Sequence, residues 1–101
     1  MEYLVEFAVE IPEGTPASEV AERQQAEAAA AARLADEGHL VRVWTRPAAT
    51  GGTHVLGLYR ADSRAQLDGL LAALPLAAWM RNDVTPLSPH PNDPATLGAP
   101  S

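Results

Sequence analysis

The chain has 101 residues, the size of one small domain. We therefore expect a single hydrophobic core and no deep cavity enclosed by this chain alone. Its 13 acidic against 7 basic residues give a formal net charge of −6, which argues against nucleic acid as a partner because nucleic-acid binding needs a basic surface. The absence of cysteine excludes disulfides, thiolate nucleophiles and cysteine-bound metals.

The N-terminal segment is typical of a strand and not of a targeting signal. Residues 1–6 lack the basic start and the uninterrupted apolar run of a signal peptide, so we expect a cytoplasmic protein. No stretch of the chain reaches the about 20 apolar residues that cross a bilayer, so no membrane partner is expected. From Tyr3 to Ile11, apolar side chains alternate with polar or small ones, which predicts a strand with one buried face.

A long helix is expected after the turn at residues 12–14. Thr15 suits the N-cap, and Pro16 suits the first helical position, where its missing N–H costs nothing. The alanine-rich sequence continues to about Glu37 and stops at Gly38, a common residue just after the end of a helix. The sequence therefore predicts one long helix between these two signals.

The middle of the chain predicts a β-hairpin. Residues 40–46 and 53–60 are rich in Val, Leu, Trp and Tyr, which favours strands. The stretch between them, residues 47–52, is rich in residues that form turns. The two strands are therefore expected to pair with each other.

A second helix and a last strand are expected to follow. Asp62 or Ser63 opens the helix, its leucines recur at helical spacing, and Pro75 ends it. An apolar connection at residues 75–80 leads to a short strand around residues 83–87.

The order strand, helix, strand, strand, helix, strand is that of the ferredoxin-like split βαβ arrangement. We therefore predict an α+β domain at residues 1–94, a ferredoxin-like βαββαβ fold with a four-stranded antiparallel sheet and its helices on one face. A flexible tail is expected at residues 95–101. Because the other face of such a sheet needs cover where it is apolar, we expect a homo-oligomer, either a dimer or a larger assembly.

One carboxylate falls on the face of the first helix that points toward the core. At about 100° per residue this face contains Val20, Gln24, Glu27, Ala31 and Leu34. A carboxylate in such a position needs either a positively charged partner or a raised affinity for protons, and the second property suits proton transfer near neutral pH. Glu27 is thus either a proton-transfer group or a member of a structural ion pair.

The other charged and polar candidates lie on the predicted strands. None of the three histidines has the spacing of metal ligands, so no metal site is expected. His54 is a candidate site residue, a polar partner or an exposed side chain. Arg42 and Trp44 share one face of the second strand with Arg46, and this row suits either a small carboxylate ligand or a solvated edge strand.

Two further aromatic residues, Tyr59 and Trp79, are more typical of a core or an interface than of a catalytic site. Gly51 and Gly52 lie in a hairpin turn rather than between a strand and a helix, so no phosphate-binding loop is predicted. The serines lie outside any nucleophile-elbow context. No cofactor is expected.

Several short motifs occur in an order and spacing that resemble a known family. In chain order they are Ile11 with Pro12, Glu27, Gly38, Trp44, Leu74 to Leu76, Trp79 with Met80, and His90 with Pro91. Over about the first nine-tenths of the chain, the sequence resembles the muconolactone isomerases of aromatic catabolism.

The resemblance implies a ferredoxin-like subunit in a cofactor-free oligomer, with a pocket between helix and sheet near a subunit interface. It implies a 1,3-proton shift that moves a double bond in a small unsaturated lactone acid, a carboxymethyl butenolide. Glu27 matches the glutamate of the family that acts as the proton shuttle.

Such a reaction needs a donor to the dienolate oxygen and a cation for a substrate carboxylate. The candidate donors are His54, Tyr59 and a backbone amide. For the cation, Arg42 is the first choice and Arg23 or Arg46 the next. Gln24, Trp44 and Trp79 complete the predicted substrate site.

The chain also departs from the family. Relatives carry a basic residue near the position of Gln24, and a Tyr and an Asn where this chain has residues 50–52, and the hairpin of this chain is longer. These positions would hold the lactone and its carboxylate, so two alternatives stay open. One is a biosynthetic isomerase or cyclase for a polyketide-like or other unsaturated substrate, and the other is a non-catalytic oligomeric binding module in which Glu27 forms an ion pair.

Overall fold

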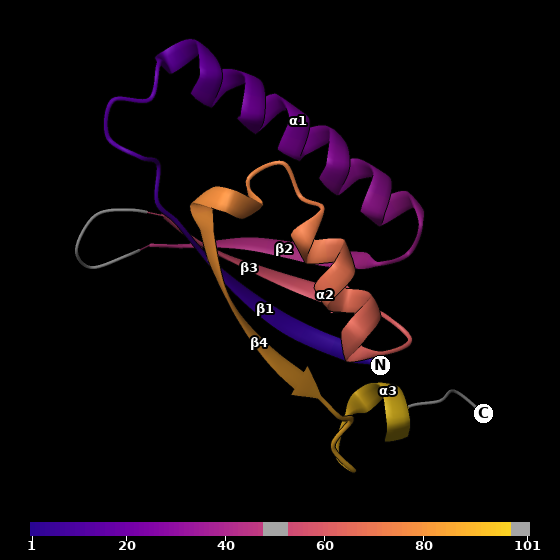
Figure 1. Cartoon of the computed structure of the whole chain (residues 1–101). Helices are drawn as coiled ribbons and strands as arrows, with labels where there is room; N and C mark the ends of the chain where they lie inside the picture. The colour runs from indigo at the N-terminus through magenta and orange to yellow at the C-terminus, as the bar shows by residue number, and fades with distance from the viewer. Residues whose placement is uncertain (48–52, 98–101) are drawn as a thin grey trace.

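The structure, a computed structural model, describes residues 1–47 and 53–97 (Figure 1). Its elements are β1 (Glu2–Val9), α1 (Ala17–Asp36), β2 (Leu40–Pro47), β3 (Thr53–Arg60), α2 (Arg64–Ala72), the short 3₁₀ helix η1 (Ala77–Trp79), β4 (Met80–Leu87) and α3 (Pro94–Leu97). The four long strands form one antiparallel sheet in the order β2-β3-β1-β4. The predicted βαββαβ arrangement is confirmed, with α1 and α2 on the same face of the sheet (Figure 1).

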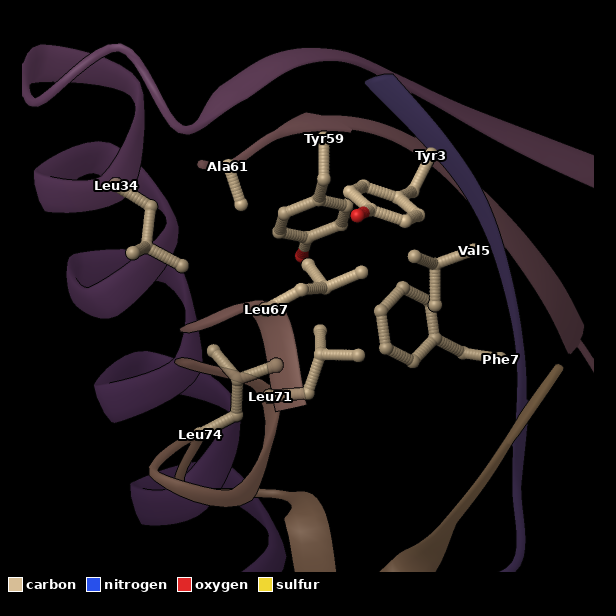
Figure 2. Packing of buried hydrophobic residues seen from close by; sticks show 9 residues of the cluster. All are labelled: Tyr3, Val5, Phe7, Leu34, Tyr59, Ala61, Leu67, Leu71 and Leu74. Carbon is tan, nitrogen blue, oxygen red and sulfur yellow. The ribbon is translucent and has the colours of Figure 1, made fainter. Parts of the chain in front are cut away.

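β1 is an inner strand and separates the two faces of the sheet. Tyr3, Val5 and Phe7 point toward the helices and are buried, whereas the residues between them are only half-buried. The core that packs around them consists of Tyr3, Val5, Phe7, Leu34, Tyr59, Ala61, Leu67, Leu71 and Leu74 (Figure 2). A fully buried side chain of this size contributes roughly 1.5–3 kcal/mol, so this cluster fixes both helices on the sheet.

Two strands differ in length from the predictions. β1 ends at Val9 instead of Ile11, because the following residue donates its backbone N–H to the carbonyl of Trp79 over 2.7 Å and Ile11 is exposed. β4 begins at Met80 instead of Asp83, because its first residue already pairs with Val9. Both differences arise from contacts between segments that are distant in the sequence.

The ends of α1 give one correction and one confirmation. Thr15 does not cap the helix, because its hydroxyl donates to the carbonyl of Pro12 over 2.6 Å, and Pro16 stands at the N-cap without a side-chain bond. Gly38 does end the helix as predicted, with a φ of +82°. Its N–H and that of the next residue bond back to carbonyls in the last turn, the Schellman arrangement that left-handed glycine permits.

The remaining helices follow local signals. Ser63 caps α2 and accepts a hydrogen bond from the backbone N–H of Gln66 over 3.1 Å, which confirms one of the two predicted caps. α2 ends at Ala72, three residues before the proline that was expected to stop it. Within residues 1–47 and 53–97, none of the helices is both long enough and apolar enough to span a bilayer.

β2 and β3 form the predicted hairpin, although most of its turn, residues 48–52, lies outside the described residues. At the other end of the chain, the short helix α3 occupies part of the predicted tail. The rest of that tail, residues 98–101, is also outside the described part. The proposed division between a domain at residues 1–94 and a tail stays a prediction.

The sheet face opposite the helices has no layer of this chain upon it among the described residues (Figure 1). Leu4 and Leu58 are register partners on this face and are half-buried, and Trp44 on β2 is exposed. Charged side chains from β1, β2 and β4 surround them. The expected homo-oligomer stays a prediction.

Candidate active site

A pocket of about 310 Å³ lies between α1 and the helix-facing side of the sheet. Its volume is at the lower end of the range of about 300–1,000 Å³ that is usual for small-molecule sites. Four strands, α1 and the connection before η1 contribute its walls. The lining residues are Phe7, Val9, Gln24, Glu27, Ala28, Ala31, Leu40, Val43, Val55, Tyr59, Leu76 and Met80.

Small side chains on α1 leave this space open. Ala28 and Ala31 face the pocket where larger residues would reach the sheet. Farther along the same helix, Leu34 fills the corresponding space and belongs to the core. The change from alanine to leucine along one helical face therefore divides a hollow end from a packed end.

Glu27 lies in the α1 wall, half-buried, as the helical pattern predicted. Its Oε1 accepts a hydrogen bond from the backbone N–H of Leu76 over 3.0 Å, which holds the carboxylate at the pocket. All arginines of the chain lie in the described residues, and none forms a salt bridge with Glu27. The alternative interpretation, a structural ion pair, therefore has no partner in this chain.

Tyr59, on β3, lines the same pocket. Its ring is buried, packs edge-to-face against Phe7 with centroids 6.1 Å apart, and extends from the sheet toward the helix layer (Figure 2). Burial, and to a smaller extent the negative charge of Glu27, raises the pKa of Tyr59 to about 12. The phenol therefore stays protonated at neutral pH and can donate a hydrogen bond.

A glycine makes room for this ring. Gly57 lies two residues before Tyr59 on the same inner face of β3, and a Cβ atom placed on it would lie 2.6 Å from Cε1 of Tyr59. That distance is well inside van der Waals contact, so any side chain at this position would displace the ring. Gly57 thus allows the tyrosine to lie over its own strand.

Gln24 also lines the pocket, one helical turn before Glu27, and its side chain is exposed. An amide can donate and accept hydrogen bonds but carries no charge. The part of the lining that Gln24 contributes is therefore polar and uncharged.

Two predicted site residues, Arg42 and Trp44, lie on the other face of the sheet. Arg42 pairs with Leu58 in the β2–β3 register, and Trp44 pairs with Leu56, while the alternating Val43 lines the pocket. Side chains along a strand alternate between its faces, so the predicted cationic and aromatic row points away from Glu27. Within this chain, neither Arg42 nor Trp44 contributes to the pocket.

His54 is on that open face as well. Its Nδ1 lies 3.1 Å from Oε1 of Glu6, and the same carboxylate oxygen accepts a hydrogen bond from Arg46 over 2.6 Å. The structure thus brings these three side chains together in one cluster, separated from Glu27 by the sheet. The strand parity of β3, with Tyr59 inward and His54 outward, is the physical reason.

Arg23 and Trp79 are joined to each other outside the pocket lining. The guanidinium Cζ lies 4.6 Å from the centroid of the indole ring, and Nη1 of Arg23 donates to the carbonyl of Pro75 over 3.3 Å. Together with the bond between Glu27 and Leu76, these contacts attach α1 to the segment after α2. Arg23 thereby supports the pocket wall from outside.

The sequence interpretation missed two parts of the site. The first is the backbone N–H of Leu76, which a pattern of side chains in the sequence cannot predict. The second is the apolar wall from the sheet, whose signal was present in the alternation of β1 and of the hairpin strands. In the part of the chain that the structure describes, no three His, Cys, Asp or Glu side chains gather as a metal site.

Comparisons with known proteins agree with this geometry. The family model described as muconolactone delta-isomerase matches residues 1–93. Muconolactone Delta-isomerase 1 of Acinetobacter lwoffii is 30% identical over 92 residues, which covers 91% of this chain and 93% of the relative. Muconolactone Delta-isomerase of Cupriavidus pinatubonensis is 32% identical over 92 residues, with 91% and 97% covered.

Solved structures show the same fold. A crystal structure of muconolactone isomerase superposes with a TM-score of 0.78 at 26% identity, covering 91% of this chain and 93% of the other. A 5-chloro-2-hydroxyhydroquinone dehydrochlorinase from Burkholderia phenoliruptrix has a TM-score of 0.66 at 15% identity, covering 92% of this chain and 99% of the other. At this identity the similarity shows a shared fold and nothing about function. From the family model and from both curated relatives, it follows that the chain belongs to the muconolactone delta-isomerase family.

Proposed function

We propose that this protein is an isomerase that moves a proton between two carbons of a small unsaturated lactone without a cofactor, with Glu27 as the proton shuttle. One observation supports it most strongly. A single carboxylate, tied at one oxygen to a backbone N–H and paired with no arginine of the chain, lies in the wall of a largely apolar pocket. Such a group can take up and release a proton beside a bound ring.

The chemistry needs one base and one face of the ring. In an unsaturated lactone the proton on the γ-carbon is acidic, because its removal gives a dienolate that spreads the charge onto the carbonyl oxygen. Glu27 takes this proton and returns it at the α-carbon, which moves the double bond. Because α1 forms one wall of the pocket, a ring lying against the sheet presents both carbons to the same carboxylate.

The hydrogen bond from Leu76 prepares Glu27 for this role. Oε1 receives the backbone N–H, which fixes the orientation of the carboxylate and leaves the second oxygen available for the proton. Because the donor is a backbone group, it keeps its proton throughout the reaction. Glu27 can therefore alternate between its charged and neutral forms in one position.

Tyr59 supplies the donor that the dienolate needs. Tyr59 lines the same pocket as Glu27, whose charge contributes to the raised pKa of the phenol, and a pKa of about 12 keeps the hydroxyl protonated. Stabilisation of developing negative charge by a positioned donor usually contributes more to such catalysis than any other single effect. Of the predicted donor side chains, Tyr59 lines the pocket and His54 lies behind the sheet.

The experiment is the Glu27→Gln variant, which keeps the size of the side chain and removes the base. We expect kcat for double-bond migration in a butenolide to fall by about 10²–10⁴-fold, the usual contribution of general acid–base catalysis. Migration is followed by ultraviolet absorbance, and exchange of ring protons for deuterium is followed by NMR. Circular dichroism verifies the fold.

Glu22→Gln is the matched control, since Glu22 lies on the exposed side of the same helix and does not line the pocket. It should retain wild-type turnover. Near-normal turnover in Glu27→Gln would remove the proposed role of Glu27. The biosynthetic alternative uses the same carboxylate on a larger unsaturated substrate, so a parallel assay with such a compound separates the two substrates.

A further inference from the structure

One peptide group between α2 and η1 is held at both of its polar atoms by side chains of α1. The carbonyl of Pro75 accepts a hydrogen bond from Nη1 of Arg23 over 3.3 Å. The N–H of the same peptide group, that of Leu76, donates to Oε1 of Glu27 over 3.0 Å. Residues four apart on a helix are neighbours on one face, so Arg23 and Glu27 reach this peptide group together.

We infer that Arg23 is a positioning residue that orients the carboxylate of Glu27 through this peptide group. The inference deepens the proposed function and rests on it, since Glu27 is there the proton shuttle. A peptide group is planar and rigid, so holding its carbonyl also fixes the direction of its N–H. A charged donor at the carbonyl also polarises the group and strengthens its N–H as a donor, because hydrogen bonds in a chain reinforce one another.

The guanidinium of Arg23 has two further contacts that fix its place. Its Cζ lies 4.6 Å from the centroid of the Trp79 ring, and Trp79 is only 8% exposed. Nη2 lies 3.7 Å from a carboxylate oxygen of Glu19, one turn earlier on α1. The aromatic contact matters more, because a partly exposed ion pair contributes little, whereas the face of an indole attracts a cation. Arg23 therefore approaches the carbonyl from a defined position.

Trp79 is in turn attached to the same segment and to the sheet. Its N–H donates to the carbonyl of Leu76 over 2.8 Å, and its own carbonyl accepts the N–H of Glu10 over 2.7 Å. The segment from Pro75 to Trp79 is therefore a tight turn anchored at the end of β1. By contacting both the first and the last residue of this turn, Arg23 holds it against α1.

The same arrangement keeps Arg23 from neutralising Glu27. Opposite charges four residues apart on a helix often pair with each other. Here the guanidinium binds the carbonyl and the carboxylate binds the N–H, and these two bonds of a peptide group point in opposite directions. Both residues lie in the described part of the chain, and their only salt-bridge contact is that of Arg23 with Glu19. The second oxygen of Glu27 thus remains available for the proton.

Arg23→Met tests the inference, because methionine keeps an unbranched side chain and removes the guanidinium. We expect kcat for double-bond migration in a butenolide to fall by about tenfold, the usual effect of one charge-assisted hydrogen bond. KM should change by less than about twofold, because Arg23 does not line the pocket. Circular dichroism verifies the fold of each variant.

The backbone N–H of Leu76 gives a second readout that general destabilisation would not produce. Without the guanidinium, hydrogen exchange at this amide, measured by NMR on the full chain, should become at least about tenfold faster, since its bond to Glu27 opens more often. The amide of Val5, in the core strand β1, should exchange at the wild-type rate. Exchange at Leu76 that stays at the wild-type rate overturns the inference.

Two further variants control for charge and for helix stability. Arg23→Lys keeps a cation and a donor at the same place, so its kcat should lie between those of Arg23→Met and the wild type. Arg33→Met removes the same group from the last turn of α1, where Arg33 is exposed and away from the pocket, and should retain wild-type kcat. An unchanged kcat in Arg23→Met, or equal losses in Arg23→Met and Arg33→Met, overturns the inference.

This test and that of the proposed function can fail separately. If Glu27→Gln loses turnover and Arg23→Met does not, the positioning role is wrong and the proton shuttle stands. If Glu27→Gln keeps its turnover, the proposed function fails, and the exchange rate of Leu76 still measures whether Arg23 holds the peptide group. In the double variant, Arg23→Met should add little to the loss caused by Glu27→Gln, because Arg23 acts only through Glu27. Losses that multiply overturn the inference.

Discussion

Replacing Tyr59 with phenylalanine removes the hydroxyl of a residue that lines the pocket and leaves the aromatic ring. The ring is 4% exposed and packs edge-to-face with Phe7 at an interplanar angle of 62°. The packing against Phe7 involves the ring and not the hydroxyl. No hydrogen bond among the described residues involves this hydroxyl. The variant should therefore fold, with a free energy of unfolding within about 1 kcal/mol of the wild type.

The expected kinetic effect is much larger. If the phenol donates to the dienolate oxygen, its removal should lower kcat by about 10²–10³-fold, as for other oxyanion donors. KM should change little, because the lost interaction forms mainly as charge develops on the oxygen. The assay is the absorbance change of a butenolide during double-bond migration, with the unfolding midpoint in urea measured on the same preparation.

Tyr3→Phe provides the control. Tyr3 is buried at 2% exposure on the same face of the sheet, but its hydroxyl contacts Sδ of Met1 at 3.7 Å and does not line the pocket. It should keep wild-type kcat. A kcat of Tyr59→Phe within about threefold of the wild type, or an equal loss in both variants, would refute the donor role.

Two further predictions concern the same ring. A free tyrosine ionises near pH 10, whereas Tyr59 in the folded protein has a pKa of about 12, so the folded state keeps the proton longer. The wild type should therefore lose about 2–3 kcal/mol of stability relative to Tyr59→Phe as the pH rises from 10 to 12 and above, whereas the two should differ little below pH 10. Urea unfolding of both proteins across this range measures the change, and a constant difference would contradict it. Gly57→Ala should displace the ring, because its Cβ would lie 2.6 Å from Cε1, and should cost about 1–3 kcal/mol of stability as well as turnover. Gly69→Ala, on α2 with nothing within 4 Å of the added Cβ, should instead stabilise by about 0.5–1 kcal/mol, and a similar loss in both variants would argue against the steric reason.

The fold could be predicted because its signals are local. The alternation in β1, the cap at Ser63 and the glycine at Gly38 each fix an element within a few residues. The errors occur where distant segments meet. The end of β1 depends on the carbonyl of Trp79, and Thr15 bonds to the preceding turn rather than to the helix, and neither partner is visible in a local pattern.

The site was predicted in part for the same reason. Glu27 and Gln24 could be assigned to the pocket because helical periodicity determines which residues share a face. The apolar wall and the Leu76 amide need the packing of three separate segments. Arg42 was selected for its charge, although a polar row on a strand covered by helices on one side is expected to point to the other side.

The choice between His54 and Tyr59 shows how strand geometry decides a chemical role. The two residues are five positions apart on β3, whose pairing with β1 runs without a shift from Ala8 opposite His54 to Tyr3 opposite Tyr59. An odd separation on a regular strand places two side chains on opposite faces, so only one of them can reach a carboxylate on α1. Burial of Tyr59 beside the leucines of α2 identifies the inner residue. Parity along the strand therefore makes Tyr59 the candidate donor on the Glu27 side of the sheet. It places the side chain of His54, although histidine is the more common proton-transfer residue, on the other side.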